Sequence, residues 1–417
     1  MSALNLLLGP RAAEFLAAAV GEYDADLTAL RVADAHVAPT GGVRVRYVGE
    51  VRRADGGVRS EVLVAAAGDR IPDGATVLAG EFEGVPAEVG VWRWPQDPAL
   101  PGLALAGHPG RLAGLLEDAG LRVPRNPRIS VRAYRPGQRA VLEVGSADDD
   151  GGPRWFVKVV RPATVPDLQI RHGLLASALP VPPVVATSER GIIVLPEAHG
   201  VVLRQLVAPG GPVAAAIPTA AALQEVLDAL PAELLDLPAR RGHLQRIDDS
   251  AAVLELTTRG RGPERLVSAV ADELRSAPTA PSHPVVPVHG DFYEAQLLVR
   301  DGRVSAVIDV DSAGPGQRAD EWANLLGHLS VLGLRSPRAR AYSAQILTHA
   351  QRHTDPQDLC LRTAAVVFGL ATGPFRSQRG DWPERTTQRL ELARRWLARM
   401  RDRSSSTPAP LIFASDI

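Results

Sequence analysis

The chain has 417 residues, which is long enough for two or three domains with large buried cores. Hydrophobic residues make up 45% of it and charged residues 22%, and the formal net charge of -1 argues against a surface that generally binds nucleic acid. No apolar run approaches the roughly 18 residues that span a membrane, and the first residues lack the basic region of a signal peptide. Cys360 is the single cysteine, which excludes intramolecular disulfides and thiolate metal cages. We therefore expect a cytoplasmic protein with no membrane or nucleic-acid partner.

Residues 1–108 are predicted to form an α+β domain. The apolar spacing of residues 11–20 is typical of a helix, and alternating runs such as 43–48 indicate half-buried antiparallel strands between glycine-rich turns. Trp92 and Trp94 could stack on a sugar, but we expect them to pack in the core. This segment carries no catalytic motif.

Residues 109–200 change to a different pattern. In chain order we expect a helix at 111–121, strands at 129–134, 140–144 and 155–160, a helix at 165–179 and a strand at 191–195. The first two strands should form a hairpin around Gly137, and the last strand should end at a break that contains Glu197. The third strand holds Lys158, which is the only lysine among 46 basic residues. Because an ammonium is a compact charge that guanidinium cannot replace, Lys158 is a candidate site residue.

Residues 201–403 are predicted to be mainly helical. Two segments, 284–298 and 303–310, interrupt the helices and alternate like a pair of strands. The last residues, 404–417, begin with serines and prolines, so we expect a disordered tail.

The strongest chemical signal lies in these two strand-like segments. The first contains His289-Gly290-Asp291 and Gln296, and the second ends in Asp309-Val310-Asp311. Phosphoryl transfer needs a carboxylate near the incoming hydroxyl, oxygen ligands for Mg²⁺ and a cation on the nucleotide phosphates. Asp291, Gln296, Asp309 and Lys158 supply these groups.

This combination resembles the aminoglycoside phosphotransferase and choline kinase family, over roughly residues 110–400. The resemblance implies a bilobal protein-kinase-like fold of the α+β class, with a β-rich N-lobe at 109–200, a helical C-lobe at 201–403 and residues 1–108 as an additional cap. Such a cap is similar to those of maltokinase-like sugar kinases.

The resemblance also implies roles for individual residues. Asp291 matches the catalytic base, while Gln296 and Asp309 match the ligands of Mg²⁺. Lys158 matches the lysine on the phosphates of ATP or GTP, and Gly137 and Glu197 join the expected nucleotide site. Asp311 either adds to a second Mg²⁺ site or caps a turn.

Two further residues match supporting positions of the family. Asp320 falls where the family has an aspartate that supports the catalytic loop. His289 is expected to hydrogen-bond to the backbone and not to carry protons.

Three features depart from the family pattern. Gln296 is one methylene longer than the usual asparagine, and the hairpin around Gly137 has only that glycine. The helix after Lys158 lacks the glutamate that normally pairs with the lysine. Asp167, Gln169 or His172 could orient Lys158 instead, and the sequence does not decide among them.

The acceptor is a small molecule whose identity the sequence leaves open. Residues 331–403 hold 14 arginines against 6 acids, the wrong balance for a polycationic aminoglycoside. We prefer a sugar or amino sugar, by analogy with other kinases that carry a cap. Two alternatives are a catalytically weak nucleotide-binding protein and an antibiotic phosphotransferase. The oligomeric state is equally open.

Overall fold

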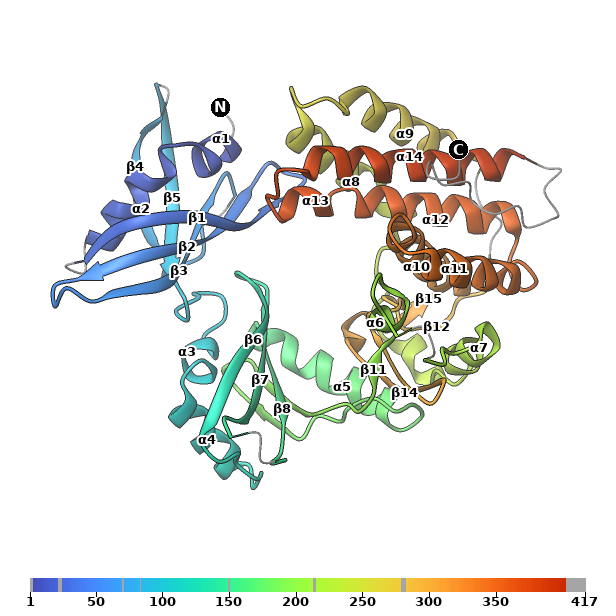
Figure 1. Cartoon of the computed structure of the whole chain (residues 1–417), viewed down its shortest axis with the longest axis horizontal. Helices are drawn as coiled ribbons and strands as arrows, with labels where there is room; N and C mark the ends of the chain where they lie inside the picture. The colour runs from blue at the N-terminus through green and yellow to red at the C-terminus, as the bar shows by residue number, and fades with distance from the viewer. Residues whose placement is uncertain are drawn as a thin grey trace. The chain divides into compact units, whose positions relative to one another are not determined.

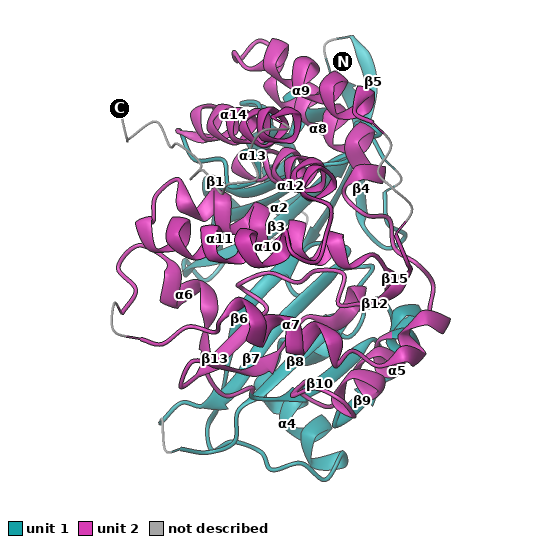
Figure 2. Cartoon of the chain, turned by 90° about the vertical axis from the view of Figure 1, so that its right-hand side faces the viewer, with its two compact units in different colours: residues 1–167, 184–197, 375–380 teal, residues 168–183, 198–374, 381–417 magenta. Residues whose placement is uncertain are grey.

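The computed structural model describes residues 3–21, 25–69, 71–82, 84–148, 151–212, 215–278 and 283–402. The predicted tail at 404–417 lies outside these residues. The chain forms two compact units, of which the first comprises 1–167, 184–197 and 375–380 and the second comprises 168–183, 198–374 and 381–417 (Figure 2). Among the described helices, none combines the length and the apolar character needed to cross a membrane.

The first unit begins with a five-stranded antiparallel sheet. Its strand order is β1-β2-β3-β5-β4, and the helices α1 (Ala3–Leu8) and α2 (Ala12–Gly21) pack against it (Figure 1). The strands are β1 (Ala25–Val37), β2 (Val43–Arg53), β3 (Val58–Ala67), β4 (Thr76–Phe82) and β5 (Val85–Arg93). Alternation along β2 places Val43, Val45 and Tyr47 in the core, as expected for a sheet with one buried face.

A second five-stranded antiparallel sheet follows in the same unit, with the strand order β6-β7-β8-β10-β9. Its strands are β6 (Pro127–Arg135), β7 (Arg139–Ser146), β8 (Trp155–Val160), β9 (Ala186–Ser188) and β10 (Ile192–Pro196), preceded by α3 (Leu103–Ala106) and α4 (Pro109–Asp118). The predicted strand at 155–160 is confirmed, and it is the central strand of the sheet.

One apolar core joins the two sheets of the first unit. It includes Val64 and Trp92 from the first sheet, and Leu142 and Val157 from the second. Trp92 is buried and donates from Nε1 to the hydroxyl of Tyr134 at 3.3 Å, so it packs in the core as expected. The predicted division of this unit at residues 108 and 109 stays a prediction.

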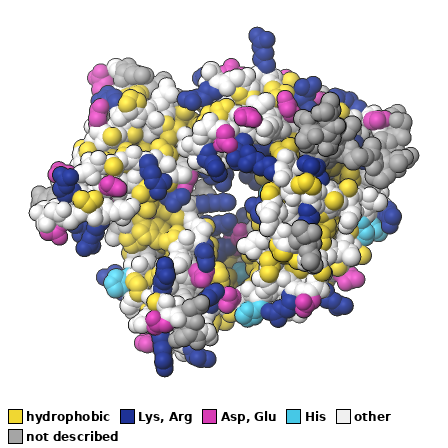
Figure 3. All heavy atoms as spheres, in the orientation of Figure 1, with side chains coloured by type: hydrophobic (Ala, Val, Ile, Leu, Met, Phe, Trp, Pro, Cys, Tyr) yellow, Lys and Arg dark blue, Asp and Glu magenta, His cyan; other side chains and the backbone are white. Residues whose placement is uncertain are grey.

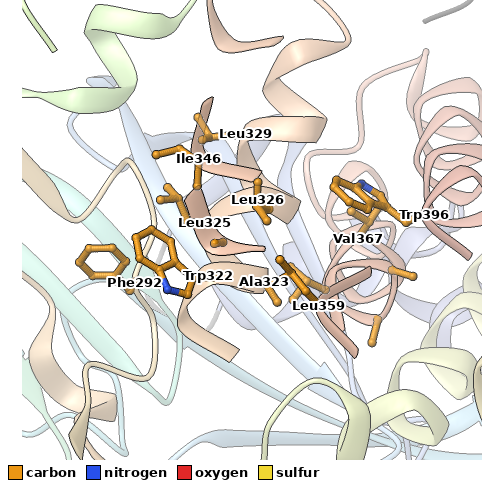
Figure 4. Close-up of a cluster of buried hydrophobic side chains, with 14 of the residues drawn as sticks. Phe292, Trp322, Ala323, Leu325, Leu326, Leu329, Ile346, Leu359, Val367 and Trp396 are labelled. Carbon is orange, nitrogen blue, oxygen red and sulfur yellow. The ribbon is translucent and has the colours of Figure 1, made fainter. Parts of the chain in front are cut away.

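The second unit is mainly helical. Its longer helices are α7 (Ala220–Asp228), α8 (Ile247–Thr258), α9 (Glu264–Ser276), α10 (Arg318–Gly333), α11 (Pro337–Ala350), α12 (Pro356–Leu370) and α14 (Trp382–Arg401). Two shorter helices are α6 (Leu203–Val207) and α13 (Gly373–Arg376). The last residues of α13 belong to the first unit. Their apolar faces meet around Trp322 and Trp396, which are fully buried (Figure 4). The β-rich and helical lobes expected from the sequence are confirmed.

Five short strands interrupt the helices. β13 (Leu297–Arg300) pairs with β14 (Arg303–Val307) as expected, and β11 (Val201–Val202) extends that sheet. The predicted strand at 284–298 is not continuous. Its first part, β12 (Val286–Val288), pairs instead with β15 (Gly314–Gly316), and the residues between β12 and β13 form a loop.

Candidate active site

Asp291 lies in the loop between β12 and β13, where a glycine makes the turn possible. Gly290 has φ +77°, a conformation that side chains rarely adopt. A Cβ at this position would lie 2.3 Å from the carbonyl oxygen of Ser312. Phe292, which follows Asp291, is fully buried beside Trp322 and anchors the loop in the helical core (Figure 4). Asp291 itself stays half-buried.

His289 holds two backbone segments of the site together. Its Nδ1 accepts the backbone N–H of Asp291 at 3.2 Å, and its Nε2 lies 3.1 Å from the carbonyl oxygen of Ile308. One nitrogen thus accepts while the other donates, which is the pattern of a neutral imidazole. Burial lowers the pKa of His289, in agreement with that state. The prediction that His289 bonds to the backbone is confirmed.

The residue that supports this loop is Glu321, and the prediction of Asp320 was wrong. The Glu321 carboxylate accepts the backbone N–H of His289 at 2.8 Å and that of Gly290 at 3.0 Å. Burial raises the pKa of Glu321 to about 7 in spite of these two bonds. Asp320 turns away and pairs with Arg362, with Oδ1 and Nη1 2.7 Å apart. The two acids are neighbours on α10, so they project in different directions.

The structure brings Asp291, Gln296 and Asp309 together. The side-chain nitrogen of Gln296 lies 3.4 Å from Oδ2 of Asp291 and 3.5 Å from Oδ2 of Asp309. Gln296 is buried, whereas the two aspartates are half-buried. Asn324, on α10, donates to the other oxygen of Asp291 at 3.3 Å. An amide nitrogen therefore lies near each oxygen of Asp291.

Asp309 has an unusual backbone conformation for a residue with a side chain. Its φ of +57° is left-handed, and it immediately precedes the short helical turn Val310–Ser312 that contains Asp311. Aspartate adopts this conformation more readily than most residues, but strain of this kind concentrates at functional sites. Asp309 and Asp311 both act electrostatically on His289, so the two carboxylates lie in the same neighbourhood.

The donor set fits Mg²⁺. Within the described ranges no three His, Cys, Asp or Glu residues form a metal-binding group, but Mg²⁺ is commonly held by one or two carboxylates with neutral oxygens and water. Gln296 places an amide between two carboxylates at distances too long for strong hydrogen bonds. The side-chain oxygen of Gln296 and the carboxylate of Asp309 would hold the cation.

Lys158 belongs to the first unit. It is 5% exposed and lies between Val141 of β7 and Ile193 of β10 in the ladder. His172 is one of the three residues that could orient Lys158, and it is buried in the second unit. The Nδ1 atom of His172 lies 3.1 Å from the carbonyl oxygen of Pro182.

Gly137 stays a predicted nucleotide-binding residue. Its backbone N–H donates to Oδ2 of Asp97 at 2.7 Å, and its carbonyl oxygen accepts from Nε of Arg161 at 3.1 Å. The N–H that a phosphate would need is therefore engaged by a buried carboxylate. Glu197 ends the second segment of the first unit, and its carboxylate lies 3.5 Å from Nη1 of Arg154.

Sequence reasoning missed three residues of the site, namely Glu321, Asn324 and Glu294. Glu321 and Asn324 are three positions apart on α10, a spacing that puts both on one face and could have drawn attention to them. Glu294 is fully buried, and its carboxylate bonds to Arg204, whose guanidinium also lies 5.5 Å from the ring centroid of Tyr293.

Arg204 and His328 contact the ring of Tyr293, two residues after Asp291. Tyr293 stacks on His328 with ring centroids 3.9 Å apart. Burial and then the charges of Arg204, His243 and Arg389 lower the pKa of His328. Burial, followed by the charges of neighbouring arginines, lowers the pKa of Arg389 to about 10. In Figure 3, Lys and Arg side chains gather in the middle of the view, near the position of α12 and α13 in Figure 1.

The sequence over residues 141–358 matches the model of the phosphotransferase enzyme family, the family of aminoglycoside phosphotransferases. The match spans more than half of the chain, and the protein belongs to this family: it is a phosphotransferase. No curated protein matches the chain in sequence.

Solved structures of phosphotransferases resemble the chain at low identity. A thermostable mutant of aminoglycoside phosphotransferase APH(4)-Ia is 18% identical, with 70% of this chain and 99% of that one covered and a TM-score of 0.47. The GDP complex of aminoglycoside 2'-phosphotransferase-IIIa is 13% identical, with 68% and 96% covered and a TM-score of 0.45. The macrolide 2'-phosphotransferase MphH from Brachybacterium faecium is 16% identical, with 67% and 97% covered and a TM-score of 0.41. The family assignment rests on the sequence model.

Proposed function

We propose that the protein transfers the γ-phosphoryl group of ATP or GTP to a hydroxyl group of a small molecule. The observation that carries this proposal is the arrangement of Asp291 and Asp309 on either side of the amide of Gln296. Membership of the phosphotransferase family supports it. In the reaction, the acceptor oxygen forms a bond to the γ-phosphorus, and the bond from that phosphorus to the bridging oxygen of the diphosphate breaks.

Asp291 takes the proton of the acceptor hydroxyl. A general base must hold one orientation, and Asp291 has one oxygen bonded to Asn324 and the other to Gln296. Asn324 also bonds to the carbonyl oxygen of Phe292, which fixes it in turn.

The remaining site residues bind the nucleotide and its metal. Gln296 and Asp309, with Asp311 beside them, would hold Mg²⁺, which neutralises charge on the phosphates when bound. Lys158 would contact the same phosphates from its own strand. Gly137 is not part of this proposal, because its N–H is bonded to Asp97.

The acceptor we propose is a sugar-sized molecule without several amino groups. Arg204 and His328 contact the ring of Tyr293, and the charge of Arg389 acts on His328. The charges of Asp291, Glu294 and Asp309 also act on Tyr293. The pair of guanidinium groups of Arg204 and Arg389 disfavours a polycationic acceptor. Among the expected acceptors, it therefore favours a neutral or acidic sugar over an amino sugar or an aminoglycoside.

An acceptor screen tests this function. The release of ADP or GDP with Mg²⁺ would be measured for a neutral sugar, its 2-amino and uronic acid forms and an aminoglycoside. We expect release that depends on the neutral or acidic sugar. Nucleotide binding without release on any acceptor would favour the alternative of a catalytically weak binding protein, and release on the aminoglycoside alone would favour an antibiotic kinase.

A further inference from the structure

A small cavity lies in the first unit, beside the turn that contains Gly137. Its walls come from β1 and β2, from the turn between β6 and β7 and from α13, and they include His36, Arg44, Arg135 and Arg376. The cavity volume is about 50 Å³. This is several times the roughly 10–15 Å³ that one water needs, so a small ion fits.

The charges around this cavity are mostly positive. Asp34 is the one acid in its wall, and its carboxylate already pairs with Arg46, with Oδ2 2.6 Å from Nε. Burial and then the charges of Arg376, Arg44 and Arg135 lower the pKa of His36. The charge of Asp34 raises this pKa, but its effect is the smallest. Three guanidinium groups and an imidazole thus line the cavity with one acid that is already engaged, while Asp97 and Asp69 act on Arg44 from outside the wall.

Arg44 has a donor that the protein does not use. Its Nη1 donates to the carbonyl oxygen of Pro136 at 2.7 Å, while its Nε is buried and has no hydrogen-bond partner among the described residues. Burial also lowers the pKa of Arg44. A buried N–H of a charged group without an acceptor is costly, and an anion in the cavity would supply the missing acceptor.

We propose that this cavity binds a small oxyanion, an inorganic phosphate or a carboxylate, between the first sheet and the turn Arg135–Gln138. The surplus of guanidinium groups matches the bidentate geometry of such anions. Because Arg44 contacts the turn and lines the cavity, the bound anion would also fix the turn to the first sheet. This inference does not depend on the proposed kinase activity.

The experiment uses the imidazole of His36 as a reporter in the full chain. The histidine proton resonances would be titrated with pH, with and without inorganic phosphate at constant ionic strength, and His36→Gln would identify the signal. We expect phosphate to raise the pKa of His36, because an anion offsets the three arginines. Acetate in place of phosphate tests whether a carboxylate suffices.

Arg376→Gln and Arg379→Gln form a matched pair of variants. Both arginines are exposed, but only Arg376 lines the cavity. We expect Arg376→Gln to raise the pKa of His36 without phosphate and to weaken phosphate binding about tenfold, while Arg379→Gln changes neither. The proposal is overturned if phosphate leaves the pKa of His36 unchanged, or if both variants weaken binding equally, which would indicate counterions only.

Discussion

At the scale of single residues, Gln296 is the most informative position, because its side chain must reach two carboxylates. Gln296→Asn shortens it by one methylene, so the amide should no longer reach both Asp291 and Asp309. We expect the Mg²⁺ concentration for half-maximal activity to rise about tenfold, since even the outer-shell partners of a metal's ligands commonly contribute 10–100-fold to its affinity. Activity measured against Mg²⁺ concentration checks this, with Gln388→Asn on the surface of α14 as the control. An unchanged Mg²⁺ requirement would contradict the assignment.

Glu321 predicts a particular dependence of stability on pH. Burial raises its pKa from an ordinary value of 4.5 in the unfolded chain to about 7 in the folded one. The folded state therefore binds the proton more tightly, and the stability that this proton contributes is lost as pH rises from about 4.5 to about 7. Chemical unfolding at several pH values should show wild type losing stability relative to Glu321→Gln over this window. The raised pKa would be contradicted if the difference in stability between wild type and Glu321→Gln did not change with pH. It would also be contradicted if the exposed Glu225→Gln gave the same change with pH.

The types of residue at the site could be predicted from the sequence, but the directions in which their side chains point could not. The motif and its spacing correctly grouped Asp291 with Gln296 and Asp309, because short strands and turns leave few ways to arrange them. The choice between Asp320 and Glu321 needs the rotation of α10, and neighbours on a helix differ by about 100°. For Gly137, no local signal announces that Asp97, 40 residues earlier, accepts its N–H.

At the scale of elements, the turn between β12 and β13 depends on Gly290. Gly290→Ala would place a Cβ 2.3 Å from the carbonyl oxygen of Ser312 and force a left-handed φ. We expect a stability loss of about 1–3 kcal/mol and a clear loss of activity, because the turn orients Asp291. Gly380→Ala is the control, since nothing lies within 4 Å of its Cβ position. Equal unfolding midpoints for the two variants would contradict this view of the turn.

The hairpins of the β-rich unit could be predicted because their alternation and turns are local. The pairing of β12 with β15 could not, since Gly314-Pro315-Gly316 has little tendency to form a strand. Only the tertiary structure brings these two segments together.

At the scale of the whole molecule, Lys158 and the acidic residues belong to different compact units. Lys158→Met keeps the length of this buried side chain and removes its charge. If Lys158 contacts the phosphates, the Kd for the nucleotide should rise about tenfold or more, as for the loss of a charge-assisted hydrogen bond. Calorimetric titration with the nucleotide measures this, and circular dichroism verifies that the sheet is intact. A Kd equal to that of wild type in a folded variant would remove Lys158 from the site.

The central claim is that Asp291 is the catalytic base, and the transfer of labelled phosphate from γ-³²P nucleotide to the acceptor tests it most directly. Asp291→Asn keeps the shape of the side chain, and Asp301→Asn, in the exposed turn between β13 and β14, is its control. We predict that Asp291→Asn lowers kcat by about 10²–10⁴-fold with nucleotide binding retained, while Asp301→Asn transfers phosphate at the wild-type rate. Transfer by Asp291→Asn at the wild-type rate would contradict the account.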